Sequence, residues 1–363
     1  SPGRGQGVFK QMKTCASYFK YSLKKVLVEM LTLTVFALLL VHFSVSQSIV
    51  HWKADGVLDI RRSDLCLWVP SAILGVLAAV LPLLRLSAFK SRRNIDTLYS
   101  FPLSRRKMVA VQLGMGIGEM FCAFTLSYLY FIFLYKLKAG AFHLFWLLPN
   151  YFVALVGGLI LYFFVAFFFW QGNTVADGIV FAIGFAGAPA LFVLDLSILF
   201  NSSLMSEAVW YLPFWHLNNT TGLFYYKAMQ DSPEVMEVMG EQLSNNAYFW
   251  ELDSLANKFY MYIVWFFVAC ILAAMLFYFA GRSKAEKAGD ISDSFLGYRT
   301  LVPFYGYSIL LNSTERAWEF SPIIYLLMIV GYILYRRGFK LRMSDWICLG
   351  GGVVPIVIGS MFK

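Results

Sequence analysis

Charged residues are scarce in this chain, at 14% of its 363 residues. Soluble globular domains carry about a quarter charged residues, so this scarcity argues against a water-soluble fold. The alternating segments of about ten residues that mark membrane β-barrels are also missing. The sequence instead contains repeated apolar runs of about 18 residues or more, each long enough to cross a bilayer as a helix. These observations predict an all-α, polytopic transmembrane helical bundle.

The sequence also lacks the motifs of several enzyme classes. It contains no GxxxxGK[ST] phosphate loop, no HExxH metal motif and no GxSxG nucleophile turn. Its five cysteines are scattered without a CxxC pair, so neither a disulfide framework nor a metal site is predicted. Gly114, Gly116 and Gly118 lie inside an apolar run, which favours close helix packing over a dinucleotide fingerprint. We therefore expect no catalytic residue, no metal ligand and no cofactor bound by this chain.

Nine candidate membrane spans are expected. They lie at about 27–46, 67–86, 108–135, 144–169, 178–199, 259–280, 297–311, 321–335 and 346–362. The seventh is short and contains Pro303 and Gly306, so a re-entrant or interfacial segment is an alternative for it. The ninth ends near Lys363, and we expect an extracellular domain to follow it in a longer parent protein.

The net charge of +9 indicates an orientation rather than a nucleic-acid partner, because an excess of Lys and Arg marks cytoplasmic loops. Basic residues gather before the first span and in the loop at 87–107, which places both in the cytoplasm. The segment at 200–257 is acidic and falls outside the cell. We expect a multi-pass membrane protein with a cytoplasmic N-terminus.

Three consecutive parts are expected along the chain. Residues 1–26 form a cytoplasmic segment with an amphipathic helix, whose basic and aromatic faces suit the lipid headgroup region. Residues 27–280 form a core of six spans. Residues 281–363 form a cytoplasmic linker and about three additional spans.

The loop at 87–107 carries the most informative pattern. Apolar residues from Ile95 to Tyr99 recur at helical spacing, which predicts a short helix with one apolar face. Pro102 ends this helix, because the residue before a proline is pushed out of helical geometry. Ser104 then caps the next helix. A plain positive-inside anchor would explain the basic residues of this loop, but it would not explain a short surface helix between two spans.

Two segments resemble a known family. The segment NIDTLYSFPLSRRKM, residues 94–108, resembles the leucine-x-serine-leucine-proline-isoleucine-serine-arginine loop of ABC-2 type ABC transporter permeases. The segment RSKAEKAG, residues 282–289, is similar to a cytoplasmic segment after span six in a Gram-positive bacterial group of these permeases, which has additional C-terminal spans. The chain departs from the pattern at Phe101, where a leucine is usual, and spans seven to nine exceed the six-span core.

The resemblance implies a type V exporter-like permease core of six spans with about three further C-terminal helices, in a bacterial plasma membrane. The loop after span two then forms a coupling helix that docks on a cytosolic ABC ATPase. Carried over to this chain, the coupling contact consists of Asp96, Leu98, Tyr99, Phe101, Pro102, Arg105 and Arg106. ATP and Mg²⁺ are bound by the partner ATPase, and a second permease subunit, identical or paralogous, completes the transporter within the membrane lipid. The turn at 171–178 is either a second point that faces the ATPase or a capped corner between two helices.

Two carboxylates fall within predicted spans, where they are costly and suggest a function. Glu119 lies near the middle of span three and could bond to a neighbouring helix, line a polar path or be protonated. Asp195 lies toward the outer end of span five, where solvation at the interface is the simpler interpretation. Glu29 is expected to pair with Lys25, four residues before it on one helix.

Three functions are compatible with these patterns. The first is the permease subunit of an ATP-driven exporter of an amphipathic substrate, namely a peptide, an antibiotic or a lipid-like molecule, with a role in antimicrobial peptide or antibiotic resistance. The second is an ion-coupled secondary transporter or channel, which needs intramembrane charges along a path. The third is a membrane-embedded enzyme that acts on lipid, for which the sequence offers no nucleophile or metal cluster.

Overall fold

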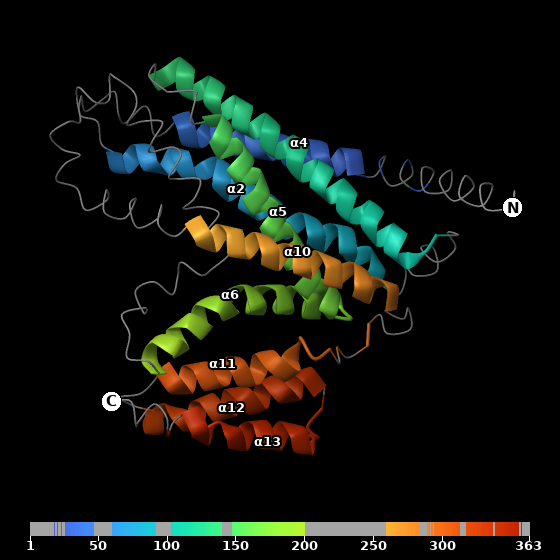
Figure 1. Cartoon of the computed structure of the whole chain (residues 1–363), viewed down its shortest axis with the longest axis vertical. Helices are drawn as coiled ribbons and strands as arrows, with labels where there is room; N and C mark the ends of the chain where they lie inside the picture. The colour runs from blue at the N-terminus through green and yellow to red at the C-terminus, as the bar shows by residue number, and fades with distance from the viewer. Residues whose placement is uncertain are drawn as a thin grey trace, which may run out of the picture. The chain divides into compact units, whose positions relative to one another are not determined.

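The computed structural model describes residues 18, 20, 23, 26–46, 60–91, 103–139, 147–199, 259–282, 289–290, 292, 294–312, 317–336, 338–355 and 357. Every secondary-structure element within these residues is a helix (Figure 1). The first is the N-terminal helix Val26–Ser46. It is followed by α2 (Ile60–Ser87), η1 (Ala88–Lys90), α4 (Arg105–Ala139), α5 (Leu147–Gln171), α6 (Val175–Leu199), α10 (Phe259–Arg282), α11 (Tyr298–Asn312), α12 (Ala317–Arg336) and α13 (Met343–Gly351). The predicted all-α fold is confirmed for this part of the chain.

Within the described ranges, six helices are long and apolar enough to cross a membrane. Their apolar stretches are Val26–Ser46, Val69–Lys90, Arg105–Leu134, Leu147–Gln171, Val175–Ser197 and Tyr262–Arg282. These agree with the first six predicted spans, and the chain is a multi-pass membrane protein. The described parts of the last three predicted spans are also mostly helical, but α11 and α13 contain only 15 and 9 residues, and the apolar part of α12 is confined to Ser321–Arg336. That these three helices cross the membrane stays a prediction.

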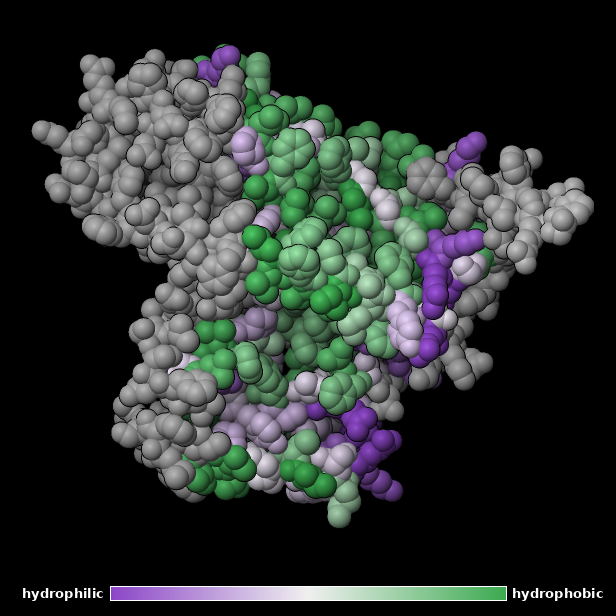
Figure 2. Space-filling view, in the orientation of Figure 1, coloured by the Kyte–Doolittle hydropathy of each residue, from purple (hydrophilic) through white to green (hydrophobic). Residues whose placement is uncertain are grey.

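The long helices expose large apolar side chains, which Figure 2 shows as green surface. Leu39 and Phe43 of the N-terminal helix, Leu129 of α4 and Ile183 of α6 are among those exposed. Such a surface is unfavourable in water, but it is what helices in contact with lipid hydrocarbon require. Proline inside α2 and α6 is tolerated for a related reason, since neighbouring groups in a bundle can satisfy the backbone carbonyls it frees.

The described residues divide into two compact units that interleave along the chain. Unit 1 contains the N-terminal helix, α2 as far as Arg85, α4, α5 as far as Phe163 and α10 as far as Phe277. Unit 2 contains η1, the end of α5 from Phe164, α6, and the chain from Tyr278 onward with α11, α12 and α13. The expected division into 1–26, 27–280 and 281–363 stays a prediction.

In unit 2, α11 packs against both α6 and α12 (Figure 1). The core between the last helices consists of Leu310, Ile324, Met328, Tyr332, Tyr335 and Leu349. Gly306 permits the close approach of α12, because a Cβ at this position would overlap with the Met328 side chain. The glycine that weakened the sequence pattern of the seventh span therefore serves helix packing.

Candidate functional site

A buried ion pair in unit 1 joins α2 to α4. The Arg85 guanidinium donates from Nε to Glu119 Oε2 at 3.0 Å and from Nη2 to Glu119 Oε1 at 2.6 Å. Arg85 is 6% exposed and Glu119 is 2% exposed. A bidentate arginine–carboxylate pair is a strong hydrogen-bonding arrangement, and it offsets the cost of burying both charges. Of the roles expected for Glu119, the geometry shows the bond to a neighbouring helix.

The same arginine also binds the N-terminal helix. Its Nη2 donates to Glu29 Oε2 at 2.6 Å, and Glu29 is half-buried. The expected partner of Glu29, Lys25, lies outside the described residues. One guanidinium thus connects three helices, and the cluster sets one positive charge against two carboxylates.

The partners of Glu119 place it near the ends of two spans. Arg85 is two residues before the end of α2, and Glu29 is three residues after the start of Val26–Ser46. Position 119 is central in α4, but α4 has 35 residues and a span needs only about 20. The Arg85 contacts therefore bring position 119, which is central in its own helix, to the level of these two span ends.

Tyr162 of α5 packs beside this ion pair. Its buried hydroxyl donates to the Leu113 carbonyl oxygen at 3.0 Å. A Cβ on Gly116 would overlap with Tyr162 Oη and lie 3.2 Å from Arg85 Cγ, so this position requires glycine. The prediction of close packing holds at Gly116 but not at Gly114 or Gly118, where a Cβ would meet no described atom within 4 Å.

Asp195 of α6 is bound to α11 within unit 2. Its Oδ1 accepts from Ser308 Oγ at 2.9 Å and from Asn312 Nδ2 at 2.8 Å. The side chain is half-buried. Simple solvation at the interface was the expectation for Asp195, and these two contacts give it a structural role instead, because α11 supplies donors that water would otherwise supply.

Most of the predicted coupling contact lies outside the described residues, namely Asp96, Leu98, Tyr99, Phe101 and Pro102. Arg105 and Arg106 are the first two residues of α4; Arg106 is exposed and Arg105 is half-buried. The predicted helix start after Ser104 is confirmed, since the Ser104 carbonyl accepts from the Met108 backbone N–H at 3.1 Å.

Lys90, the last residue of η1, is buried against the end of α5 in unit 2. Its Nζ donates to the carbonyl oxygens of Phe169, at 2.6 Å, and Gly172, and it lies 4.4 Å from the centre of the Phe169 ring. A cation at the C-terminal end of a helix satisfies carbonyls that have no partner within the helix and complements the negative end of its dipole.

The turn that follows α5 is bonded to the segment before α11, also in unit 2. Asp177 Oδ2 accepts from Ser292 Oγ at 2.6 Å, and Asp177 Oδ1 accepts from the Tyr298 hydroxyl at 3.0 Å. The Asn173 backbone N–H donates to Ser292 Oγ at 2.7 Å. The Gly289 backbone N–H donates to the Asn173 carbonyl at 3.0 Å. These bonds join parts of the chain that are more than a hundred residues apart.

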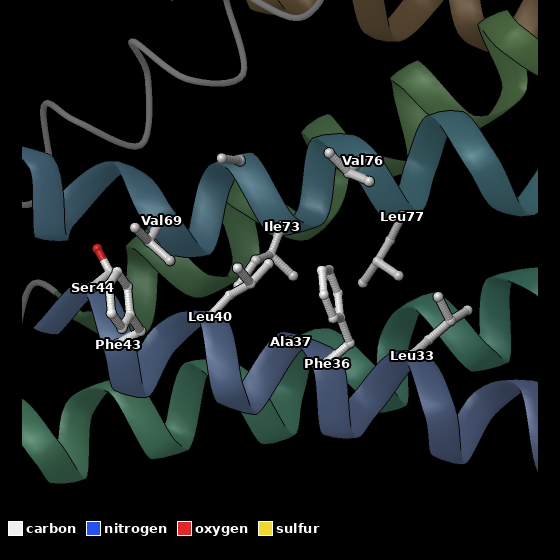
Figure 3. A pocket seen from close by; sticks show the side chains of 11 residues that line it. Leu33, Phe36, Ala37, Leu40, Phe43, Ser44, Val69, Ile73, Val76 and Leu77 are labelled. Carbon is white, nitrogen blue, oxygen red and sulfur yellow. The ribbon is translucent and has the colours of Figure 1, made fainter.

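An apolar groove of 580 Å³ lies between the N-terminal helix and α2 in unit 1 (Figure 3). Leu33, Phe36, Leu40 and Phe43 line one side, and Val69, Ile73, Val76 and Leu77 line the other. Ser44 adds a hydroxyl. This volume is within the range of small-molecule sites, and the lining accepts hydrocarbon while offering no charge to a polar ligand.

Among the residues described, no three or more His, Cys, Asp or Glu side chains gather as a metal site would require. The contacts between helices given above are ion pairs and hydrogen bonds. Whether the whole chain lacks catalytic chemistry stays a prediction.

Sequence reasoning did not single out Arg85, Lys90 or Asp177. A signal existed for Arg85, because it is the one charged residue within the predicted span at 67–86. A charge in one span and a carboxylate in the next are reason to expect a pair. Lys90 carries no comparable signal, since its partners are backbone carbonyls, which every residue type possesses.

No protein-family model, curated protein or solved structure matches this chain.

Proposed function

We propose that this chain is the permease subunit of an ABC transporter of the ABC-2 type, which moves an amphipathic substrate across or out of a bacterial plasma membrane. The position of the segment at 94–108 carries the proposal. It follows η1, which ends at Lys90, and runs into the first turn of α4, which begins at Arg105. A coupling helix between the second and third spans is what the family resemblance implies, and six long apolar helices are available to form the core.

In this proposal the energy comes from separate ABC ATPase subunits, which bind ATP and Mg²⁺ in the cytosol. Closure of the ATPases pulls on the loop around Leu98 and Pro102, and the spans switch between inward-facing and outward-facing states. A second permease subunit, a copy or a paralogue, forms the other half of the pathway. The exposed apolar helices and the groove between the N-terminal helix and α2 favour a substrate with a hydrocarbon part, such as an amphipathic peptide, an antibiotic or a lipid.

Purification of the tagged chain from its own bacterial membrane in mild detergent tests the proposal. We expect an ABC ATPase subunit to remain bound at close to one per chain. Tyr99→Asp should abolish this binding without lowering the yield of the chain, because it places a charge on the apolar face that docks. Lys340→Met, which changes an exposed lysine elsewhere, should leave binding intact. A chain that never carries an ATPase, or a Tyr99→Asp variant that binds it normally, contradicts the proposal.

The buried cluster of Arg85, Glu29 and Glu119 is the observation that favours a second candidate, an ion-coupled transporter or channel. Charges inside the membrane are what ion coupling needs, although here each described carboxylate of the cluster is bound by Arg85. Reconstitution in liposomes separates the two. Flux that requires a proton or sodium gradient and proceeds without any ATPase would favour the second candidate over the first.

A further inference from the structure

The α5–α6 turn, residues 171–178, contacts two other parts of unit 2. On one side it binds Lys90, which lies four residues before the segment at 94–108 that we assign to the coupling loop. On the other side it is bonded to residues 289–298, which lead into α11. The turn therefore connects the proposed docking loop with the helices that exceed the six-span core.

The connection to Lys90 is strong because the lysine is buried and its ammonium is bound by backbone carbonyls. An ammonium removed from water is costly unless its protons have acceptors, so Lys90 is held where Phe169 and Gly172 supply them. Movement of the chain at position 91 must either carry the end of α5 along or break these bonds.

The turn itself leaves little freedom between α5 and α6. A Cβ on Gly178 would lie 2.6 Å from the Phe169 ring, so the first turn of α6 lies directly on the end of α5. Thr174 caps α6, since its Oγ1 accepts from the Asp177 backbone N–H at 3.0 Å. The two helix ends therefore move together.

Hydrogen bonds join α6 to α11 at three positions along their length. Asp177 binds Tyr298 at the start of α11, Tyr305 donates its hydroxyl to the Gly184 carbonyl at 2.6 Å, and Asp195 binds Asn312 at the end. Phe181 also packs edge-on against Tyr298, with 4.8 Å between ring centres. Because α12 packs on α11, a displacement of α6 is passed to both.

We propose that the α5–α6 turn is a rigid relay, in which Lys90 receives movement from the docking loop and Asp177 passes it to α11 and α12. This inference rests on the proposed function, and it assigns the C-terminal helices a part in coupling. Asp177 and Lys90 are positioning residues in it, since each acts through the backbone or side chains that it holds.

The test uses the complex of the full chain with its ATPase in lipid nanodiscs, and it measures bound ATPase per chain and the rate of ATP hydrolysis. Asp177→Ala should lower the rate at least fivefold while the ATPase stays bound. Arg299→Ala, at an exposed position one residue after Tyr298, should leave the rate unchanged. Lys90→Met should act like Asp177→Ala, because it removes the input to the same relay.

A disulfide distinguishes transmission from a general structural defect. The Asn173 backbone nitrogen and Ser292 Oγ are 2.7 Å apart, which makes positions 173 and 292 the pair to test for a disulfide, and loss of the free thiols on oxidation shows that the bond has formed. In the Asp177→Ala background, the oxidised Asn173→Cys, Ser292→Cys pair should restore the rate to within twofold of the unsubstituted chain, and dithiothreitol should remove the restoration.

Asp177→Ala with a normal rate, or an oxidised pair that fails to restore it, overturns the relay while the proposed function stands. Absence of any bound ATPase on the unsubstituted chain overturns the proposed function, and the relay with it. Failure of the relay and failure of the proposed function therefore give different results in the same nanodisc preparation.

Discussion

The Arg85 guanidinium donates to both carboxylate oxygens of Glu119, with Nε–Oε2 and Nη2–Oε1 distances of 3.0 and 2.6 Å. Both side chains are almost fully buried in unit 1. A pair of this kind contributes little compared with an apolar pair of the same shape, but removal of one partner leaves a buried charge alone. The structure therefore predicts unequal effects of single and double substitutions.

Arg85→Met should destabilise the protein by about 3–5 kcal/mol, because Glu119 then stays buried without its counter-charge. Glu29 cannot compensate, since it is a carboxylate too. The double variant Arg85→Met, Glu119→Leu should recover most of this loss. Thermal unfolding in detergent, followed by tryptophan fluorescence, measures both effects, and Arg106→Met at an exposed position is the control. Equal stability of the single and double variants would show that the pair is not coupled.

Gly116→Ala should lower the stability, because the added Cβ overlaps with Tyr162 Oη and lies 3.2 Å from Arg85 Cγ. Gly118→Ala, two residues further along α4, should raise stability by about 0.5–1 kcal/mol, since alanine is the better helix former and its Cβ meets no described atom. The same unfolding measurement compares the two. Tyr162→Phe should relieve part of the Gly116→Ala defect, and a defect that is unchanged in the double variant contradicts the overlap.

The helices and their order were predictable because hydrophobicity over about 20 residues is a local property of the sequence. Even α11, which is short and contains Pro303 and Gly306, forms a helix where the pattern predicted one. The interleaving of the two units was not predictable. It depends on which helix faces which, and α5 and α10 are apolar on all sides, so their sequences do not mark an inner face.

A site residue was predictable from the sequence only where its side-chain type was unusual for its surroundings. Glu119 stood out as a charge within an apolar run, but its bond to Arg85 depends on the relative depth of α2 and α4. Lys90 binds backbone carbonyls, which leave no pattern in sequence. The sequence marked the turn at 171–178, but the partners of Asp177 lie more than a hundred residues further along the chain. The residues of the coupling motif between 92 and 102 lie outside the described part of the chain, and their role stays a prediction.

Lys90→Met should loosen the end of α5, because the Gly172 carbonyl loses its buried donor and the Phe169 carbonyl keeps only the Gly172 backbone N–H. An unsatisfied buried group costs about 1–3 kcal/mol, so local opening should become roughly 5- to 150-fold more frequent. Amide hydrogen exchange across residues 167–178 measures this, with Lys340→Met as the control at an exposed lysine. Exchange in this segment that matches the unsubstituted protein would mean that Lys90 does not support the turn.

The junction between α12 and α13 should respond to acid through Asp345. Its carboxylate accepts from Arg336 Nε and Nη2 at 3.1 and 2.9 Å and from the Arg342 backbone N–H at 2.9 Å. Burial opposes ionisation of this group, but these donors outweigh it and hold the pKa of Asp345 below its ordinary value. Since the unfolded pKa is about 3.9, the stabilisation is complete above that value and is lost as pH falls through the lower folded pKa.

Hydrogen exchange of the α13 amides, corrected for the intrinsic effect of pH, should therefore show constant protection from pH 7 to about 5 and a loss of protection below about 4. Asp345→Asn should show weaker protection throughout and no further loss in acid, because the amide cannot ionise and pairs poorly with Arg336. Lys340→Met, in the loop before α13, should keep the full acid response. An acid response that survives in Asp345→Asn would assign the titration to another group and remove the ion pair as the element that holds α13 in place.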